Sequence, residues 1–500
     1  MKVRGFGALV FFLFSCVFAY AQKSLKVDAV FSNYMVLQRN HKIPVWGVVK
    51  PNTEVQVVFK GKTIITTSNA QGNWNVYFKK QKAGGPFQLS VSSEKDTIKF
   101  NDILIGEVWL ASGQSNMHLD LKRTLNGEAV AKKVKNSNIR IYNMKPTFPT
   151  GEEGVHTIEE LNKIQNNNYF NTQGWVKATT ENVLYFSAVA YYFAEKLQKE
   201  LNVPVGIIHN AVPGSPIESW LSKKIIDEDV EISELVKQRW ADKEEEKDGM
   251  ISVAKKQISL SENKNQKHPW MASYNYNNGV LPLIKIPIKG IIWYQGESNA
   301  EHPVLYKKMF KKMVALWRSD FSADFPFYYV QLTSREDRSA WSEFRNAQRE
   351  LLYEVPSCKM AVITDVGDRQ DTHAKNKKPV GERLALLALG NAYKSVKGFE
   401  SPIFDKVTFS KNTYSIHFKG EFKALKAKPS KEVIGFEISD DNINFEKLEP
   451  IILKKSINFK APKHYVTPLY IRYAWKPYTD ANLVSESGLP ASTFRIKIER

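Results

Sequence analysis

The first part of the chain alternates short apolar runs with turn residues. Runs rich in β-branched and aromatic side chains, such as residues 45–49 and 55–59, are separated by turn signals such as Pro51-Asn52 and Gly84-Gly85-Pro86. Short strands at this spacing are typical of an antiparallel β-sandwich. Residues 22–105 are therefore predicted to form an N-terminal β domain without a catalytic cluster.

The middle part of the chain has a different pattern of apolar and polar residues. Stretches of helical periodicity alternate with apolar, strand-like runs that lie before Ser115 and at residues 205–208, 288–293, 327–332 and 360–364. This alternation favours the α/β class, with a parallel sheet covered by helices on both faces. In such folds ligands bind beyond the carboxyl ends of the strands. The domain is predicted to span residues 106–398, and its Lys- and Glu-rich segment 223–267 is predicted to be a helical insertion, either a lid or plain surface.

Strand-like runs return in the last part of the chain. They lie at residues 406–409, 414–418, 433–438, 457–459, 469–475 and 494–498. Residues 399–500 are therefore predicted to form a second β-sandwich-like region. Since no repeat or low-complexity linker separates the parts, we expect all three to pack together.

The amino terminus has the pattern of a secretory signal peptide. Lys2 and Arg4 precede an apolar run at residues 6–18, and Ala-Tyr-Ala at 19–21 supplies the small residues of a cleavage site. We expect export of the mature chain to the periplasm or the cell exterior. Lipidation of Cys16 is the alternative. No other apolar run is long enough to span a bilayer, so no integral membrane segment is expected after cleavage.

The net charge is strongly positive, at +19 from 71 Lys and Arg against 52 Asp and Glu. The lysines are spread along the whole length, without an arginine-rich arm or zinc-finger spacing, so nucleic acid is not an expected partner. The charge is interpreted mainly as surface composition, with some weight for an acidic sugar substrate.

Four polar stretches stand where strands of the predicted parallel sheet should end. They are Ser-Gly-Gln-Ser-Asn at 112–116, Asn-Ala-Val-Pro-Gly-Ser-Pro-Ile-Glu at 210–218, Trp-Tyr-Gln-Gly-Glu-Ser-Asn at 293–299 and an Asp-rich stretch ending in His at 365–373. Because parallel strands end at the same edge of the sheet, we expect these stretches to meet.

Together they supply the groups that acyl transfer needs. Ser115 is the predicted nucleophile and His373 the base that takes its proton. A carboxylate must orient the imidazole, and Asp371 is the nearest in sequence, with Asp368 and Asp365 as alternatives. The oxyanion hole is predicted from the backbone N–H groups of Ser115 and Gly214 with a side-chain amide of Gln295 or Asn299.

Competing interpretations remain open for several of these residues. His118 is a rival base, although on the same helix as Ser115 it is expected to point elsewhere, and Glu297 with Glu218 or Asp371 would suit a glycosidase. A non-catalytic glycan-binding protein is a further alternative. No metal-ligand spacing or phosphate loop stands out, so no metal or cofactor is predicted.

Several motifs in order carry a family resemblance. They are residues 35–39 (MVLQR), 44–47 (PVWG), 105–117 with the GQSNM turn, 214–220, 293–299, 371–373 with Asn376-Lys377, 381–385 and 488–491. With these motifs the chain resembles the sialate O-acetylesterase family of the SGNH (GDSL-like) hydrolases. The resemblance implies a three-layer α/β/α hydrolase domain with attached β regions, Ser115 as nucleophile and His373 as base. It also implies an oxyanion hole from Ser115, Gly214 and the third stretch.

The chain departs from the wider SGNH pattern at three positions. Gln370 stands where the acid is usual, three residues before the histidine, so either Asp371 is the acid or a Ser–His dyad operates. Ser298 stands where an Asn is common, which leaves Gln295 as the preferred oxyanion donor and Asn299 as the alternative. Met117 replaces the last Gly of a GxSxG elbow, which argues against an α/β-hydrolase lipase. The expected function is an exported serine esterase that removes O-acetyl groups from carbohydrates, sialic acids first and acetylated xylan as the alternative.

Overall fold

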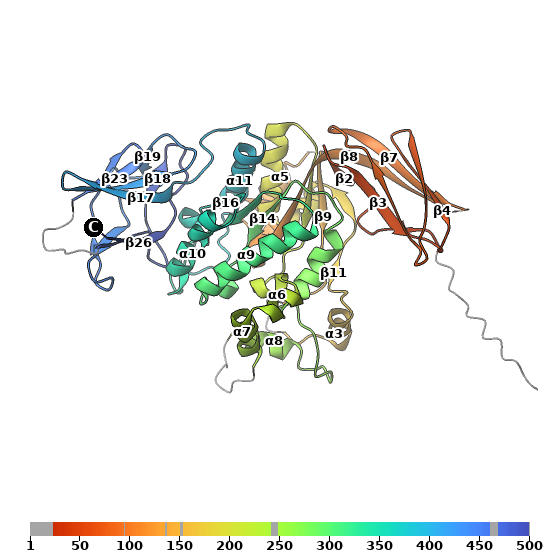
Figure 1. The fold of residues 1–500 in the computed structure, drawn as a ribbon, viewed down its shortest axis with the longest axis horizontal. Helices are drawn as coiled ribbons and strands as arrows, with labels where there is room; N and C mark the ends of the chain where they lie inside the picture. Colours follow the sequence, from red (N-terminus) through yellow and green to blue (C-terminus); the bar gives the residue numbers. More distant parts are fainter. Residues whose placement is uncertain are drawn as a thin grey trace, which may run out of the picture.

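The computed structural model describes residues 24–94, 96–135, 138–150, 154–241, 249–460 and 469–499. The expected signal peptide and Cys16 lie outside these residues. An α/β body stands in the centre, with one β region at each end of the long axis (Figure 1). The predicted fold class, α/β with β regions at both ends, is confirmed.

The central sheet has seven strands in the order β12-β9-β13-β8-β14-β15-β16, and only the edge strand β12 is antiparallel. Their bounds are β8 Asp96–Gly113, β9 Ile139–Asn143, β12 Trp175–Lys177, β13 Val205–His209, β14 Gly290–Tyr294, β15 Phe327–Val330 and β16 Cys358–Ala361. The inner strands β13, β14 and β15 are buried along their whole length, as expected for a parallel sheet covered on both faces.

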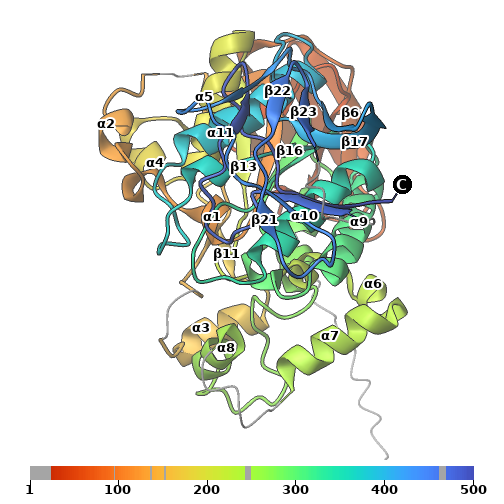
Figure 2. The same ribbon diagram turned by 90° about the vertical axis from the view of Figure 1, so that its left-hand side faces the viewer.

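Two pairs of helices cover the sheet. Helix α5 (Ala188–Leu201) contacts α11 (Lys378–Leu387), and α9 (Pro303–Asp320) contacts α10 (Trp341–Glu354). Viewed along the long axis, the strands lie between these pairs (Figure 2). Helix α11 continues into a π-helical turn, η7 (Ala388–Ala392). The three layers follow from apolar stripes on helices that pack against an apolar sheet.

Strand β8 belongs to two sheets and crosses the predicted domain boundary between residues 105 and 106. Its first half alternates between exposed and half-buried side chains and pairs antiparallel with β7 (Gly84–Ser93). From Ile103 onward every residue is buried, and the strand is the central strand of the parallel sheet. The remaining N-terminal strands are β1 Lys26–Val27, β2 Val36–Gln38, β3 Ile43–Val48, β4 Glu54–Phe59, β5 Lys62–Thr67 and β6 Asn73–Phe78.

The C-terminal β region has its own apolar core, built around side chains such as Ile416, Phe436 and Phe494. Its two four-stranded sheets are β17-β18-β23-β22 and β21-β20-β24-β26, with a further pair β19-β25. The bounds are β17 Ile403–Ser410, β18 Thr413–Lys419, β19 Leu425–Ala427, β20 Phe436–Ser439, β21 Glu446–Lys447, β22 Ile451–Leu453, β23 Ser456–Phe459, β24 Leu469–Tyr473, β25 Leu483–Ser485 and β26 Phe494–Ile498.

The described part of the charged segment 223–267 contains three helices. Helices α6 (Lys223–Glu228), α7 (Val230–Trp240) and α8 (Met250–Gln257) lie beside α3 (Ile158–Gln165), below the sheet in Figure 2. Short helices α1 (Ser115–His118), α2 (Gly127–Ala131) and α4 (Thr180–Leu184), the two-residue strands β10 (Lys145–Pro146) and β11 (Phe170–Asn171), and 3₁₀ turns complete the described elements.

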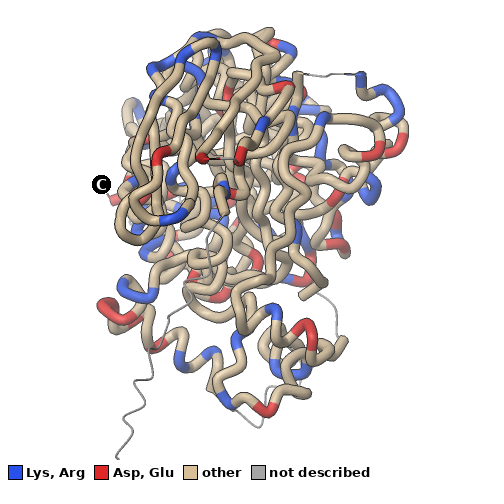
Figure 3. Tube along the Cα trace, turned by 90° about the vertical axis from the view of Figure 1, so that its right-hand side faces the viewer, with Lys and Arg blue, Asp and Glu red and all other residues tan. Residues whose placement is uncertain are grey.

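Charges of both signs are distributed over the face that carries the N-terminal β region (Figure 3). On this face the positive charge does not gather into a single stripe of the kind that follows a nucleic-acid backbone. Within the described residues, every helix is too short or too polar to cross a membrane.

Candidate active site

The turn that carries Ser115 follows directly from the end of β8. Gly113 has a φ of +141°, and a Cβ atom there would stand 2.1 Å from the carbonyl oxygen of Tyr294, so only glycine allows this close approach. The N–H of Gln114 then donates to the same Tyr294 oxygen at 3.0 Å. Ser115 begins helix α1 and remains partly exposed. The turn is thereby fixed against β14 and directs a serine to the edge of the sheet.

Ser115 and His373 line one cavity of about 410 Å³. They come from segments far apart in the sequence, one after β8 and the other after β16, and meet at the carboxyl edge of the parallel sheet. His118 also lines this cavity, although we expected it to point elsewhere. Burial, together with the charges of Arg123 and Lys145, lowers the pKa of His118 to about 4, so its imidazole is neutral at neutral pH.

The three candidate acids differ in their surroundings. The carboxylate of Asp365 accepts two hydrogen bonds of 2.6 Å from Arg383. Asp368 is exposed and accepts the N–H groups of residues 370 and 371, each at 2.9 Å. Asp371 accepts the backbone N–H of His373 at 2.7 Å, and it is the one of the three whose charge acts on the imidazole.

Opposing effects act on the imidazole of His373. Burial lowers its pKa, and the positive charge of Lys377 acts in the same direction, with smaller contributions from Arg123 and Arg335. The negative charge of Asp371 raises the pKa and offsets part of this effect. The net shift is downward, so the ring is neutral and able to accept a proton at neutral pH.

The predicted oxyanion donors divide into two groups. Gly214, at φ +74°, directly follows Pro213, which lines the cavity, and its carbonyl accepts the hydroxyl of Ser298 at 3.0 Å. Gln295 and Asn299 are fully buried and bonded elsewhere. The amide of Gln295 donates to the carbonyl of Ser215 at 3.3 Å and to Asn299 at 2.8 Å. These two side chains support the 214–218 loop and are not part of the cavity wall.

Two of the carboxylates of the glycosidase alternative, Glu218 and Glu297, are engaged by other protein groups. Glu218 is 1% exposed, lies 2.7 Å from Arg239 and accepts the amide of Asn299 at 2.9 Å. Glu297 accepts the amide of Asn116 at 2.5 Å. Neither carboxylate lines the cavity that holds Ser115, so the pair has no access to a sugar bound there.

The sequence did not reveal a buried polar network behind the Ser115 turn. The amide nitrogen of Asn116 donates to Glu297 and, at 3.0 Å, to the carbonyl oxygen of Thr372, while the ammonium of Lys377 donates to the amide oxygen. All of these residues lie in quoted motifs, but their spacing along the chain gives no sign that they meet.

Two cations on the cavity wall were also not predicted. Arg123 and Lys145 line it together with the mainly apolar segment Pro146 to Pro149. No carboxylate is among the described lining residues, although Asp120, outside the wall, lies 3.4 Å from the Arg123 guanidinium. Arg123 lies at the end of a three-residue 3₁₀ turn and Lys145 in a two-residue strand, and elements this short carry little sequence signal. The wall therefore favours an anionic ligand next to Ser115.

The site offers acid–base and nucleophilic chemistry from side chains alone. Within the described ranges of the chain, three or more His, Cys, Asp or Glu side chains nowhere gather in a way that could hold a metal ion. The polar side chains among the described lining residues are two hydroxyls, two imidazoles and two cations.

Comparison with known proteins points to one family. A family model described as carbohydrate esterase, sialic acid-specific acetylesterase, matches residues 105–389. The chain is similar to sialate O-acetylesterase from Homo sapiens, with 26% identity over 95% of this chain and 94% of that protein. It is also similar to the enzyme of that name from Mus musculus, with 28% identity over 75% of each chain. A solved carbohydrate acetylesterase from Xanthomonas citri has a TM-score of 0.77 and 29% identity, over 94% of this chain and 99% of that one.

Proposed function

The chain belongs to the sialic acid-specific acetylesterase family of carbohydrate esterases, and we propose that it removes O-acetyl groups from sialic acids through an acyl-serine intermediate. The resemblance inferred from the motifs is confirmed by this match, and the chain is a carboxylic ester hydrolase. The observation that carries the proposed mechanism is the shared cavity of Ser115 and His373.

In the first half-reaction the Oγ atom of Ser115 attacks the acetyl carbonyl carbon while His373 takes the hydroxyl proton. Collapse of the tetrahedral intermediate breaks the bond to the sugar oxygen, which takes the proton from His373 as it leaves. Water then attacks the acetyl-serine with His373 again as base, and releases acetate. Asp371 is the proposed acid, since its charge favours the imidazolium that forms in both steps.

The N–H groups of Ser115 and Gly214 are the proposed oxyanion donors, because Gly214 follows a residue of the cavity wall. Gln295 is the proposed side-chain donor, and Asn299 its alternative. For Gln295 to reach the oxyanion, its 3.3 Å bond to the Ser215 carbonyl has to open when substrate binds. The expected leader at residues 1–21 supports export, to the periplasm or the cell exterior.

The wall of the cavity supports an acidic sugar. Sialic acid carries a carboxylate, and Arg123 and Lys145 are cations without a carboxylate among the described lining residues. Acetylated xylan, the alternative substrate of the same fold, is neutral and gains nothing from these charges. The expected order is therefore hydrolysis of O-acetylated sialic acid above that of acetylated xylan.

Ser115→Ala tests the mechanism. We expect complete loss of p-nitrophenyl acetate hydrolysis and of labelling by a fluorophosphonate reagent, with the thermal unfolding midpoint unchanged. Ser112→Ala is the matched control because Ser112 is buried in the same turn, and this variant should still be labelled. Turnover retained by Ser115→Ala would overturn the mechanism.

Arg123→Ala and Lys145→Ala test the substrate. A charge-assisted hydrogen bond contributes about 1.5–3 kcal/mol, so KM for O-acetylated sialic acid should rise about tenfold or more. The kinetics on p-nitrophenyl acetate should stay the same in Lys145→Ala, and also in Arg123→Ala at a pH above the acidic limb, because Arg123 lowers the pKa of His373 as well. An equal loss on both substrates, or a wild-type preference for acetylated xylan, would contradict the assignment of an acidic sugar.

A further inference from the structure

Asn116 links the two halves of the candidate site. It directly follows Ser115, and its amide nitrogen donates at 3.0 Å to the carbonyl oxygen of Thr372, which directly precedes His373. One fully buried side chain therefore connects the turn of the nucleophile with the loop of the base. The two segments are otherwise held by different strands, β8 and β16.

The orientation of the Asn116 amide is fixed by charges at both of its ends. Its nitrogen donates to the carboxylate of Glu297 at 2.5 Å, and its oxygen accepts the ammonium of Lys377. A flipped amide would direct its oxygen at the carboxylate and its hydrogens at the ammonium, so both bonds would become repulsive. Lys377 is only 2% exposed, and Glu297 keeps one buried carboxylate oxygen without a partner among the described residues.

We propose that Asn116 is a positioning residue that sets the distance between nucleophile and base, and that Lys377, whose ammonium is bonded to the same amide, is the buried charge that acts on the base. The inference rests on the proposed function, since it assigns Ser115 and His373 these roles. Glu297 is included as the counter-charge that keeps both Asn116 and Lys377 in place.

The charges near His373 determine the direction in which each substitution should shift the pKa of this base. The groups that act on His373 are Lys377, Arg123 and Arg335, which lower its pKa, and Asp371, which raises it. Lys377 in turn faces Glu297 and Asp371, while burial lowers its own pKa to about 8. It therefore keeps its proton through the neutral range. Its removal should raise the pKa of His373, whereas removal of Asp371 should lower it.

The experiment measures kcat/KM for p-nitrophenyl acetate against pH. In Lys377→Met the acidic limb of the profile should move to higher pH, because His373 then holds its proton more tightly. In Asp371→Asn the limb should move to lower pH. Lys377→Arg keeps the charge and should keep the wild-type limb. Lys375→Met removes an exposed lysine of the same loop and should also leave the limb in place.

Asn116→Ala tests the positioning role without a change of charge. We expect kcat to fall about 100-fold, the size of effect that a misplacement of roughly 1 Å produces, with KM for the small ester unchanged. This variant also keeps the test decisive if Lys377→Met does not fold. An acidic limb that stays in place in folded Lys377→Met, or wild-type kcat in Asn116→Ala, would overturn the inference.

The outcomes separate this inference from the proposed function. A wild-type protein that neither hydrolyses the ester nor reacts with fluorophosphonate contradicts the serine mechanism itself. An active, labelled wild type whose Lys377→Met and Asn116→Ala variants behave like it contradicts only the roles assigned to those two residues.

Discussion

The two β regions are attached to the hydrolase body in different ways. The N-terminal region shares a strand with it: β8 pairs with β7 in its first half and with β13 and β14 in its second. It also shares the body's apolar core, in which Val36 and Trp46 cluster with Trp175 and Ile291. Backbone and core are continuous across this junction.

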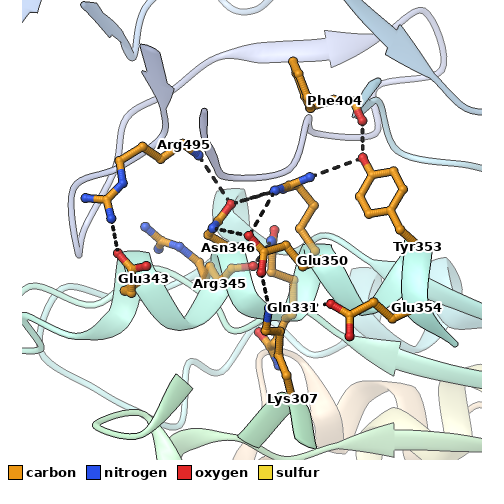
Figure 4. A network of polar contacts seen from close by, with 12 residues as sticks. Lys307, Gln331, Glu343, Arg345, Asn346, Glu350, Tyr353, Glu354, Phe404 and Arg495 are labelled. Carbon is orange, nitrogen blue, oxygen red and sulfur yellow. Dashed lines mark hydrogen bonds and ion pairs between the residues drawn. The ribbon is translucent and has the colours of Figure 1, made fainter. Parts of the chain in front are cut away.

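The C-terminal region has a separate core and is joined mainly by polar contacts on α10. Arg345, fully buried, donates to the carbonyl oxygens of Ala474, Lys476 and Pro477 at 2.6–3.1 Å. Figure 4 shows the neighbouring contacts: Asn346 accepts the backbone N–H of Arg495, Glu343 pairs with the Arg495 guanidinium, and Tyr353 donates to the carbonyl of Phe404.

The two kinds of attachment predict different responses when a junction is disrupted. Disrupting a shared strand and core should destabilise the hydrolase body and the N-terminal region together, in one cooperative transition, since the same residues support both parts. Breaking a polar junction releases a region that keeps its own core, so its effect should stay local.

The largest effect is expected from Gly106→Val, in the middle of β8. A Cβ atom at Gly106 would stand 2.0 Å from the carbonyl oxygen of Pro204, which is backbone and cannot give way. We expect the free energy of unfolding to fall by about 3 kcal/mol or more, in a single urea transition that also abolishes activity. Gly154→Val is the control, because a Cβ atom there meets nothing within 4 Å. Unfolding of the N-terminal region with activity retained would contradict a shared junction.

An intermediate effect is expected from Arg345→Met, which leaves buried carbonyl oxygens without donors. Each such group costs about 1–3 kcal/mol, but removing a buried cation recovers part of the loss, so we expect about 2 kcal/mol. Burial lowers the pKa of Arg345 to about 9, which shows how costly its charge is at this position. Hydrogen exchange should increase in residues 403–499 while p-nitrophenyl acetate is still hydrolysed. An equal loss of hydrogen-exchange protection in the N-terminal and C-terminal β regions would contradict the proposed difference between the two junctions.

The smallest effect is expected from Tyr478→Ala. Arg369, on the loop that leads to His373, lies 4.1 Å from the centre of the Tyr478 ring, and the N–H of Arg335 donates to the carbonyl of Pro477. A cation–π contact at an exposed site contributes about 0.5–1 kcal/mol, so kcat/KM should fall by about two- to fivefold. If kcat/KM stays at the wild-type value, the C-terminal region has no influence on the base.

The sequence predicted the α/β class, the β regions and the strand before Ser115 because long apolar periods carry strong signals. It did not predict β9 and β12, which are only five and three residues long and include polar side chains such as Arg140. Nor did it show that β8 continues across the boundary predicted between residues 105 and 106.

For the site, the motifs led to Ser115 and His373, and both line one cavity. The link from Asn116 to Glu297 and Lys377 spans 181 and 261 residues, so no local pattern could show that these side chains meet. The cavity wall around Arg123 and Lys145 escaped prediction because turns carry little periodicity. The identity of the acid stays a prediction, with Asp371 best supported by its charge effect on His373.

The strand shared by two sheets also decides which parts of this enzyme can be exchanged. A graft that joins a foreign N-terminal region at residue 105 would have to reproduce the pairing of β2 with β8, three residues long, and the fit of Gly106 against Pro204. A replacement C-terminal region would have to present carbonyl oxygens to Arg345 and polar partners to the neighbouring side chains of α10. Fusion partners and domain swaps between relatives should therefore be tolerated at the C-terminal junction and rejected at the N-terminal one.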